Sequence, residues 1–322
     1  MQSDFLSTMI NGKQHQVFLI VILFLTNLIS VQAQDPVLPA TNLGLTNMLD
    51  GAAPPPGFYY QNYTQVFKAN RFYGSNGKKT NSDLKVNYLL SLHQFIYLSR
   101  IAVLHGNLEF TVMLPLVKLS ATGTADKLPN VNPGVVGDLT MGSGIQWSDK
   151  KLFNKGFWSR VEIDLTIPSG SGKKEFNINP SAQLYTLSSY YAFTLFLNKK
   201  LSVSTRNHIS YNFNKKGADQ QPGAFYNVNY ALEYAIINKF RAEIAGYYLK
   251  QFRQDSFHGN SHYYQENMGI TDTREQIFAV GPGLSYQTSS GIFIEAKVFF
   301  ETAAENRFEG VKPSIRIGIP LK

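Results

Sequence analysis

The sequence contains one pair of residues with the spacing of a catalytic nucleophile and its base. His208 and Ser210 lie two positions apart, so an extended strand would place both side chains on one face. A histidine activates a serine hydroxyl when the two are in hydrogen-bond reach and a third group orients the imidazole. The pair therefore raises a hydrolase hypothesis, which we weigh against the interpretation that both residues are polar side chains on the wetted face of a strand.

Metal and phosphate chemistry have weaker signals. His258 and His262 lie four apart, a spacing that binds zinc on a helix. Gly259 and Asn260 between them favour a loop, so we expect solvated side chains and no metal. The two Gly-Ser-Gly strings, at 142–144 and 170–172, lack the following helix that a phosphate site needs. The chain has no cysteine, which excludes disulfides, thiolate metal ligands and cysteine nucleophiles. We expect no cofactor.

The elements that must position these residues are strands. Along most of the chain, polar and apolar residues alternate with a period of two, which places them on opposite faces of an extended strand. Several of the runs approach the length that a membrane-spanning strand needs. The clearest alternating runs are Leu108–Leu116, Val161–Ile167, Tyr226–Tyr234, Ile292–Phe300 and Ile315–Leu321.

The composition agrees with a sheet that has one apolar and one polar face. Aromatic residues make up 13% of the 322 residues and charged residues only 16%, which does not suit a highly charged disordered chain. In a membrane barrel, the apolar face meets lipid and the polar face lines the lumen. Open sheet edges are too costly in lipid, so the sheet must close. The sequence therefore predicts an all-β fold, a transmembrane antiparallel up-and-down β-barrel.

The connections between the expected strands alternate between long and short, as they do in outer-membrane barrels. This alternation predicts about twelve strands, with ten or fourteen as the alternatives if a hairpin is missed or split. The expected long connections are Arg71–Ser82, Ser120–Gly137, Pro168–Pro180, Asn214–Gly223, Arg253–Arg274 and Thr302–Lys312. The expected short ones are Ser99–Asn107, Ser148–Phe157, Asn198–Lys200, Ile237–Phe240 and Gln287–Gly291.

The N-terminal region has the pattern of an export signal. An apolar run, Val17–Leu25, is followed by Val31-Gln32-Ala33, whose small residues match a signal-peptidase site. We expect residues 1–33 to be a signal peptide cut near Ala33 and the mature protein to lie in the outer membrane of a Gram-negative bacterium. Residues 34–56 would form a periplasmic segment or a plug in the lumen, and residues 57–322 the barrel.

The charged residues on the polar parity are the candidates for the lumen wall. The net charge of +8 comes from basic pairs scattered at turns, so we expect no nucleic-acid partner. The partners that a barrel implies are outer-membrane lipid, a small-molecule solute and the barrel-assembly machinery. The candidate lumen residues are Arg160, Glu162, Asp164, Arg206, His208, Glu233, Arg241, Glu243, Glu295, Lys297, Glu301 and Arg316.

Six short strings occur in order along the chain: Pro55–Tyr59, Gly137–Thr140, Pro168–Gly170, Ala245–Tyr248, Gly281–Tyr286 and Asn306–Gly310. Together they resemble the outer-membrane family associated with the meta-cleavage pathway of phenol degradation. The motif positions are Gly137, Asp138, Pro168, Gly170, Gly246, Tyr247, Gly281, Pro282, Asn306, Arg307 and Gly310. Ser169 stands where the family usually has threonine. The resemblance covers about residues 55–320 and implies a barrel that transports hydrophobic or aromatic compounds.

The resulting hypothesis is a non-enzymatic channel that passes small, aromatic or hydrophobic solutes by passive diffusion. A second hypothesis is a structural or adhesive barrel whose loops bind partners, because tyrosines such as Tyr263 and Tyr264 favour interfaces. A third is an outer-membrane lipase that uses His208 and Ser210. We rank it last, because parity points the pair into the lumen, away from lipid. The sequence also has Tyr211-Asn212 after the pair, where the outer-membrane phospholipase has Asn-Gly.

Overall fold

The computed structural model describes residues 42–124 and 128–321. The expected signal peptide, residues 1–33, and its cleavage site lie outside the described residues. The barrel strands are β1 (Gly57–Tyr73), β2 (Lys85–Val103), β3 (Gly106–Thr122), β4 (Leu139–Leu152), β5 (Lys155–Ile167), β6 (Thr186–Phe196), β7 (Leu201–Asn212), β9 (Phe225–Ile237), β10 (Phe240–Gln251), β12 (Gln276–Gln287), β13 (Phe293–Glu305) and β14 (Arg307–Leu321).

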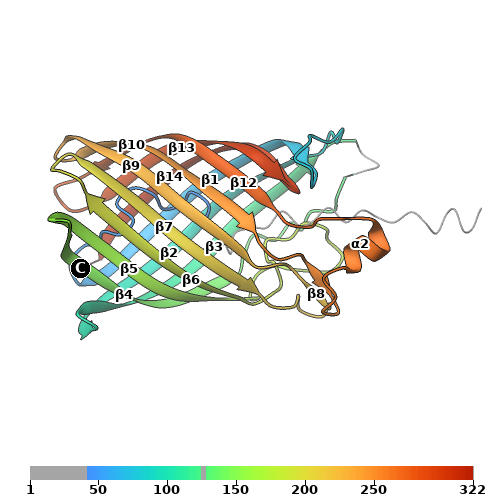
Figure 1. The fold of residues 1–322 in the computed structure, drawn as a ribbon, viewed down its shortest axis with the longest axis horizontal. Helices are drawn as coiled ribbons and strands as arrows, with labels where there is room; N and C mark the ends of the chain where they lie inside the picture. Colours follow the sequence, from blue (N-terminus) through green and yellow to red (C-terminus); the bar gives the residue numbers. More distant parts are fainter. Residues whose placement is uncertain (1–41, 125–127, 322) are drawn as a thin grey trace, which may run out of the picture. The chain divides into compact units, whose positions relative to one another are not determined.

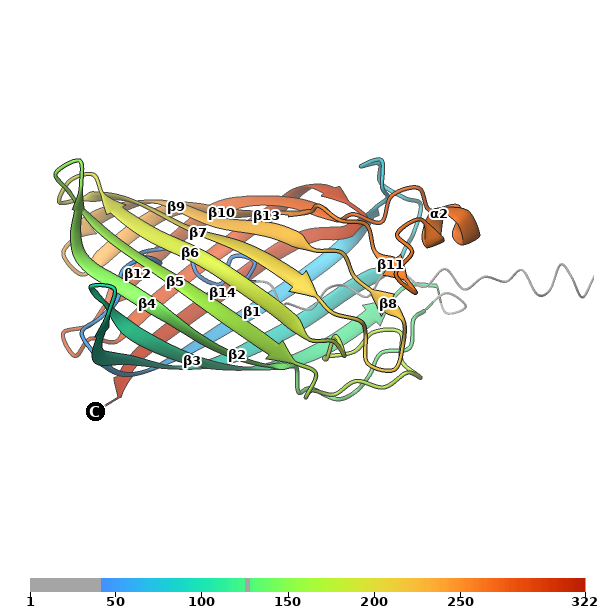
Figure 2. The same ribbon diagram turned by 60° about the horizontal axis from the view of Figure 1, so that its bottom comes forward.

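These twelve strands form one closed barrel in which each strand pairs with its neighbours in sequence (Figures 1 and 2). The first and last strands close it: β1 pairs antiparallel with β14, from Phe58 opposite Leu321 to Tyr73 opposite Arg307. Closure leaves no row of unpaired backbone groups along the wall. The predicted fold, an antiparallel up-and-down barrel of about twelve strands, is confirmed.

The alternation of the sequence becomes the two faces of the wall. On β5, Arg160, Glu162 and Asp164 are buried on the inner face, whereas Ile163 between them is 58% exposed on the outer face. On β7, Ile209 is likewise 59% exposed. The barrel thus presents an apolar outer surface and a polar, charged inner one.

The connections at one end of the barrel are tight turns. Leu104 and His105 join β2 to β3, and Phe153 and Asn154 join β4 to β5, all with positive φ between 48° and 61°. Two consecutive residues with positive φ match the right-handed twist of the paired strands, as in two-residue hairpin turns. The longer connections lie at the opposite end, where each precedes β2, β4, β6, β9 or β12.

One expected loop is wrong. Residues Thr302–Lys312 do not form a long connection, because β13 runs to Glu305, β14 begins at Arg307, and Asn306 alone joins them. The polar residues of this stretch indicated a solvated loop. In the structure they take part in ion pairs along a long hairpin, where Lys312 meets Glu301 and Arg307 meets Glu275.

The long connections carry a little further structure. β8 (Gln220–Gln221), in the connection between β7 and β9, pairs with β11 (Ser256–Phe257), in the connection between β10 and β12. α2 (Tyr263–Met268) follows β11 and lies beyond one end of the barrel (Figure 2). Across residues 42–124 and 128–321, no helix is long and apolar enough to cross a membrane.

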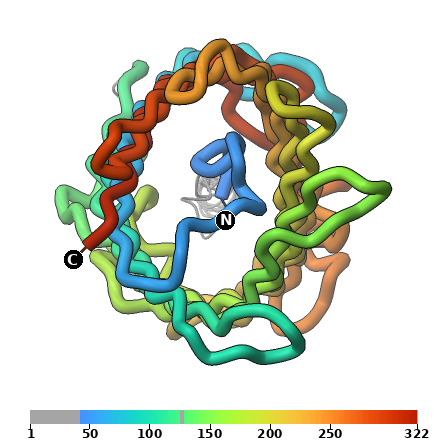
Figure 3. The backbone as a smooth tube through the Cα atoms, turned by 90° about the vertical axis from the view of Figure 1, so that its left-hand side faces the viewer, coloured from blue at the N-terminus to red at the C-terminus, as the bar shows by residue number. Residues whose placement is uncertain are grey.

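The stretch before β1 lies inside the ring of strands, as the view along the barrel shows in blue (Figure 3). We call residues 42–53 the inner segment. It consists of bends and turns and contains neither helix nor strand. Leu43, Leu45, Met48 and Asp50 of this segment are all at most 5% exposed. The inner segment and the wall around it form the site described next.

Candidate functional site in the barrel lumen

The inner segment is anchored by the side chain of Asn47, which is 1% exposed. Its amide nitrogen donates to the backbone oxygens of Tyr230, at 3.1 Å, and Gly246, at 2.8 Å. Its amide oxygen accepts a hydrogen bond of 3.0 Å from the Lys297 ammonium. One side chain therefore ties the segment to β9, β10 and β13.

The backbone of the inner segment is also bound by side chains of the wall. A buried backbone group without a partner is costly, so a segment with no regular structure needs such partners. Three backbone N–H groups of the segment donate hydrogen bonds to wall side chains: Gly44 to Asn229 (3.1 Å), Leu49 to Glu233 (2.8 Å) and Gly51 to Thr194 (3.0 Å). Three backbone oxygens of the segment accept hydrogen bonds from wall side chains: Leu45 from Lys297 (3.1 Å), Met48 from Arg316 (3.1 Å) and Gly51 from Gln146 (3.0 Å).

Close approach to the wall requires a glycine at position 51. A Cβ added to Gly51 would lie 2.3 Å from the backbone carbon of Phe193 on β6, a separation that non-bonded carbons do not reach. The contact between Gly51 and β6 brings the preceding residue, Asp50, against the charged inner face of β5 and β7.

Two of the three leucines of the inner segment, Leu43 and Leu45, pack into separate apolar patches of the inner wall. Leu45 contacts a cluster that contains Tyr63, Phe67 and Leu90. Leu43 contacts a second cluster, with Phe225, Ala231, Ala245, Tyr247, Leu249, Ile277, Ala279, Phe299 and Ala304. Burial of a leucine side chain contributes about 1.5–3 kcal/mol, so apolar contacts add to the polar anchors.

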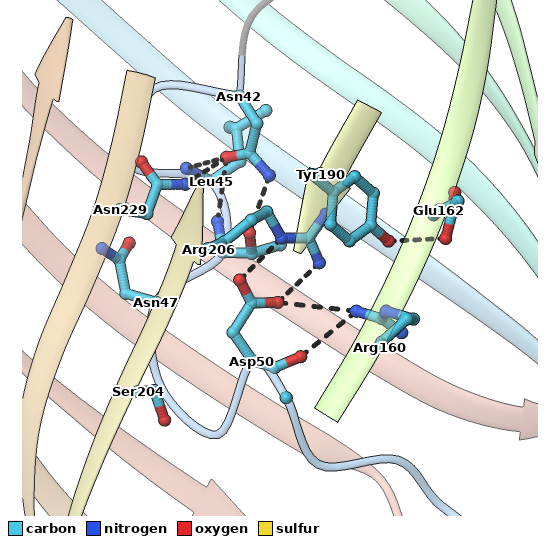
Figure 4. Close-up of polar contacts among 12 residues, drawn as sticks. Asn42, Leu45, Asn47, Asp50, Arg160, Glu162, Tyr190, Ser204, Arg206 and Asn229 are labelled. Carbon is cyan, nitrogen blue, oxygen red and sulfur yellow. Dashed lines mark hydrogen bonds and ion pairs between the residues drawn. The ribbon is translucent and has the colours of Figure 1, made fainter. Parts of the chain in front are cut away.

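Asp50 lies between two arginines of the wall (Figure 4). Its carboxylate accepts two hydrogen bonds from Arg206, at 2.7 Å from Nε and 2.6 Å from a terminal nitrogen. A terminal nitrogen of Arg160 lies 3.6 Å from the same carboxylate and donates to the Asp50 backbone oxygen at 3.2 Å. Burial alone would raise the pKa of Asp50, but Arg206, Arg160 and Arg316 outweigh it and hold that pKa below the ordinary value of 3.8.

Further groups hold the two arginines in place. The Arg206 guanidinium carbon lies 4.0 Å from the centroid of the Tyr190 ring, and the Tyr190 hydroxyl donates to Glu162. Arg160 donates to both carboxylate oxygens of Glu109, at 3.1 and 3.3 Å. Both arginines are therefore oriented by the barrel wall as well as by Asp50.

Other charged residues of the lumen form three more groups. Glu295 pairs with Lys297 at 3.2 Å and with Arg316 at 2.9 Å. Glu233 lies 3.6 Å from Arg241.

The third group surrounds Glu301, which pairs with Lys312 at 2.9 Å. Glu301 also accepts hydrogen bonds from the Tyr247 hydroxyl, at 2.6 Å, and from Gly310 N, at 3.0 Å. Charges of opposite sign thus cross-link neighbouring strands along the inner wall.

The candidate lumen residues lie on inner positions of six strands, where all are buried except Arg241, which is partly buried. Arg160, Arg206, Lys297 and Arg316 contact the inner segment. Glu233 contacts it too, through Leu49 N. The full set is Arg160, Glu162 and Asp164 on β5, Arg206 and His208 on β7, Glu233 on β9, Arg241 and Glu243 on β10, Glu295, Lys297 and Glu301 on β13, and Arg316 on β14.

His208 and Ser210 do not form a catalytic pair in the structure. The Ser210 hydroxyl hydrogen-bonds the Ser188 hydroxyl at 2.8 Å. The His208 imidazole lies 3.4 Å from the Asn227 amide nitrogen and edge-on to the Tyr190 ring. The other two histidines raised above also have separate surroundings, because His258 contacts Asp219 and His262 precedes α2. Among the described residues, no cluster of three histidine or acidic side chains has the geometry to hold a metal ion.

Two of the resembling strings meet at the end of the barrel that carries the long connections. Asp138 accepts hydrogen bonds from Gly170 N at 3.0 Å, Ser181 Oγ at 2.6 Å and Ala182 N at 2.9 Å. A Cβ on Gly170 would lie 2.5 Å from the carbonyl carbon of Gly137. Gly137, Asp138 and Gly170, with Pro168 at the end of β5, therefore fix how two long connections pack together.

The remaining motif positions lie on the strands from β10 to β14. Gly246 and Tyr247 lie on β10 opposite Val280 and Ala279 of β12, and Gly281 and Pro282 follow along the same pair of strands. Asn306 forms the turn between β13 and β14 with φ of 49° and donates to the backbone oxygens of Asp272 and Arg274. Arg307 forms an ion pair with Glu275, and Gly310 donates to Glu301.

Several residues of the site were not among the sequence candidates. Glu109 and Tyr190 lie on the inner face of their strands, and parity gave a signal for Glu109. Lys312 lies on β14, at the end of the stretch Thr302–Lys312 that the sequence predicts to be a loop. Asp50 and Asn47 lie in the segment before the first strand, where no periodicity indicates what a side chain will contact.

Comparisons with known proteins agree with this architecture. A solved outer membrane channel from Pseudomonas putida F1 is similar to the chain with a TM-score of 0.72 and 16% identity, over 84% of this chain and 97% of that one. The translocator domain of the autotransporter NalP from Neisseria meningitidis is a weaker match, with a TM-score of 0.45 and 10% identity over 85% of this chain and 91% of that one. No curated protein matches the chain by sequence. Residues 69–317 match the model of the family described as "Putative MetA-pathway of phenol degradation", and the chain belongs to that family.

Proposed function

We propose that the protein is an outer-membrane channel through which small solutes diffuse passively. The observation that carries the proposal is the inner wall of the closed barrel, which is lined by buried charged side chains while the outer wall is apolar. A barrel of about twelve strands is wider than the side-chain-filled barrels of about eight strands and narrower than the open porins of about sixteen. The inner segment would narrow such a lumen further.

The solutes we propose are small aromatic compounds. The family description refers to phenol degradation, and the solved channel from Pseudomonas putida F1 shares the fold. We further propose that the apolar outer residues contact outer-membrane lipid, and that the barrel-assembly machinery inserts the chain after the signal peptide is cut near Ala33.

Reconstitution tests the channel. The purified full-length mature protein should give stepwise currents in planar bilayers and should admit phenol into liposomes. Asn47→Ala weakens the anchoring of the inner segment and should increase the fraction of time spent at high conductance. Asn267→Ala, an exposed substitution in α2, is the matched control and should behave as the wild type. Absence of both current and uptake in the wild type and in Asn47→Ala would refute the proposal.

A further inference from the structure

The Asp50 carboxylate is bound in the lumen in the way that a protein binds a small anion. Two parallel hydrogen bonds from Arg206, of 2.7 and 2.6 Å, form the fork-to-carboxylate arrangement (Figure 4), which combines charge-assisted hydrogen bonds with a specific geometry. Arg160 adds a second positive charge at 3.6 Å. Asp50 belongs to a segment without regular structure, whereas both arginines belong to strands of the wall.

The register of the sheet builds this arginine pair without help from the inner segment. Arg160 on β5 lies opposite Ala192 on β6, and Ala192 lies opposite Arg206 on β7. The two arginines thus stand at one level of the wall, on either side of a residue with a small side chain. Glu109 and Tyr190 orient them from the wall.

The buried charge of Arg206 makes it costly to remove the Asp50 carboxylate without replacing it by another anion. Arg160 has a second ionic partner, Glu109 at 3.1 Å, which belongs to β3 of the wall and not to the inner segment. Arg206 is 7% exposed and forms its ion pair with Asp50. A buried charge that loses its partner destabilises a protein strongly, so a withdrawn Asp50 leaves a position that favours another anion.

We propose that Arg160 and Arg206 form a binding site for the carboxylate of a small organic acid, and that Asp50 occupies this site as a tethered stand-in. A solute carboxylate and Asp50 compete for the same two guanidinium groups. The inference rests on the proposed channel only in that a solute must reach the lumen, and binding is measurable without transport.

Competition with a tethered group sets the expected affinities. A tethered ligand acts at an effective concentration in the millimolar range or above, so the wild type should bind a free carboxylate weakly. Removal of the Asp50 carboxylate should raise the affinity about tenfold or more. Loss of the Arg206 guanidinium should abolish the gain, because that side chain supplies both hydrogen bonds to the carboxylate.

Isothermal titration of the detergent-solubilised full-length protein tests the site, with benzoate as the probe. Asp50→Ala should bind benzoate about tenfold more tightly than the wild type, and the neutral isostere benzamide should not bind. Adding Arg206→Gln to Asp50→Ala should remove benzoate binding. Adding Arg274→Gln, an arginine in the connection between β10 and β12 that pairs with Asp272, should leave it unchanged.

Asp50→Asn covers the case in which Asp50→Ala does not fold. It keeps a side chain of the same shape and removes only the charge, so it should show the same gain in benzoate affinity. Equal benzoate affinity in the wild type and the folded Asp50 variants would overturn the proposal. So would benzoate binding that survives Arg206→Gln, or displacement of benzoate by sulfate at equal concentration, which would indicate a site for any oxyanion.

The benzoate titration and the ion-current measurement can refute the carboxylate site and the channel independently of each other. Ion currents together with no benzoate binding would refute the carboxylate site and leave the channel standing. Benzoate binding together with no current and no solute uptake would refute the channel and leave the site standing.

Discussion

Removal of the Asn47 side chain should release the inner segment by a predictable amount. Asn47→Ala eliminates two hydrogen bonds to backbone oxygens, of Tyr230 and Gly246, and one from the Lys297 ammonium. A buried hydrogen bond contributes about 0.5–1.5 kcal/mol, and one to a charged group about 1.5–3 kcal/mol. The free energy of docking should therefore fall by about 2.5–6 kcal/mol, which multiplies the undocked fraction roughly 60-fold to 20,000-fold.

Cysteine labelling measures that fraction. The chain contains no cysteine, so Thr46→Cys introduces a unique thiol. Thr46 is 5% exposed and its hydroxyl accepts a hydrogen bond from Asn42, at 2.7 Å. When docking and undocking are fast compared with labelling, the rate of reaction with a maleimide follows the undocked fraction.

In the Thr46→Cys background, Asn47→Ala should accelerate labelling by the factor given above. Asn267→Ala removes an exposed side chain that donates to the Tyr263 backbone oxygen within α2; it is the control and should not change the rate. Circular dichroism and heat-modifiable gel mobility should show the same folded barrel in each variant. A labelling rate for Asn47→Ala equal to that of the control would show that Asn47 does not anchor the segment, and would refute the reasoning.

Three further predictions concern charge, packing and pH. Glu301→Gln leaves Lys312, which is 2% exposed, without its ionic partner, so the free energy of unfolding in urea should fall by about 3–5 kcal/mol. Lys312→Met in the same chain should recover part of it, and equal stability of all three proteins would contradict the prediction. Gly170→Ala places a Cβ 2.5 Å from the carbonyl carbon of Gly137, which should destabilise the packing of the two long connections by about 1–3 kcal/mol. Trypsin should therefore cleave faster at Lys173 and Lys174. Gly74→Ala, where an added Cβ meets no atom closer than 3.8 Å, is the control and should not change the cleavage rate. Because the pKa of Asp50 lies below 3.8, its contribution to docking is complete above that pH and is lost as the pH falls through the lowered value. The high-conductance fraction should therefore rise only below pH 3.8, and Asp50→Asn should lack this step; a step of the same size in both proteins would refute the assignment to Asp50.

The sequence predicted the wall of the barrel well, because each strand faces the same two environments along its whole length. The period-two pattern of Val161–Ile167 alone places Arg160 and Glu162 on one face and Ile163 on the other, and the structure has them there. The hairpin of β13 and β14 was missed for a physical reason. Its polar residues satisfy one another across strands, as Glu301 does with Lys312, and a polar stretch in a sequence looks the same whether water or an ion pair surrounds it.

The sequence by itself determined the fold class, the polarity of both faces and which charged residues of the long alternating strands belong to the lumen wall. These properties follow from local alternation, which requires no knowledge of distant contacts. Only the tertiary structure decided which charges meet. Asp50 contacts Arg206 across 156 positions of sequence, and Asn47 contacts Gly246 across 199. Such contacts depend on the register of strands around the closed barrel and on the path of a segment without periodicity, and neither is written in a local pattern.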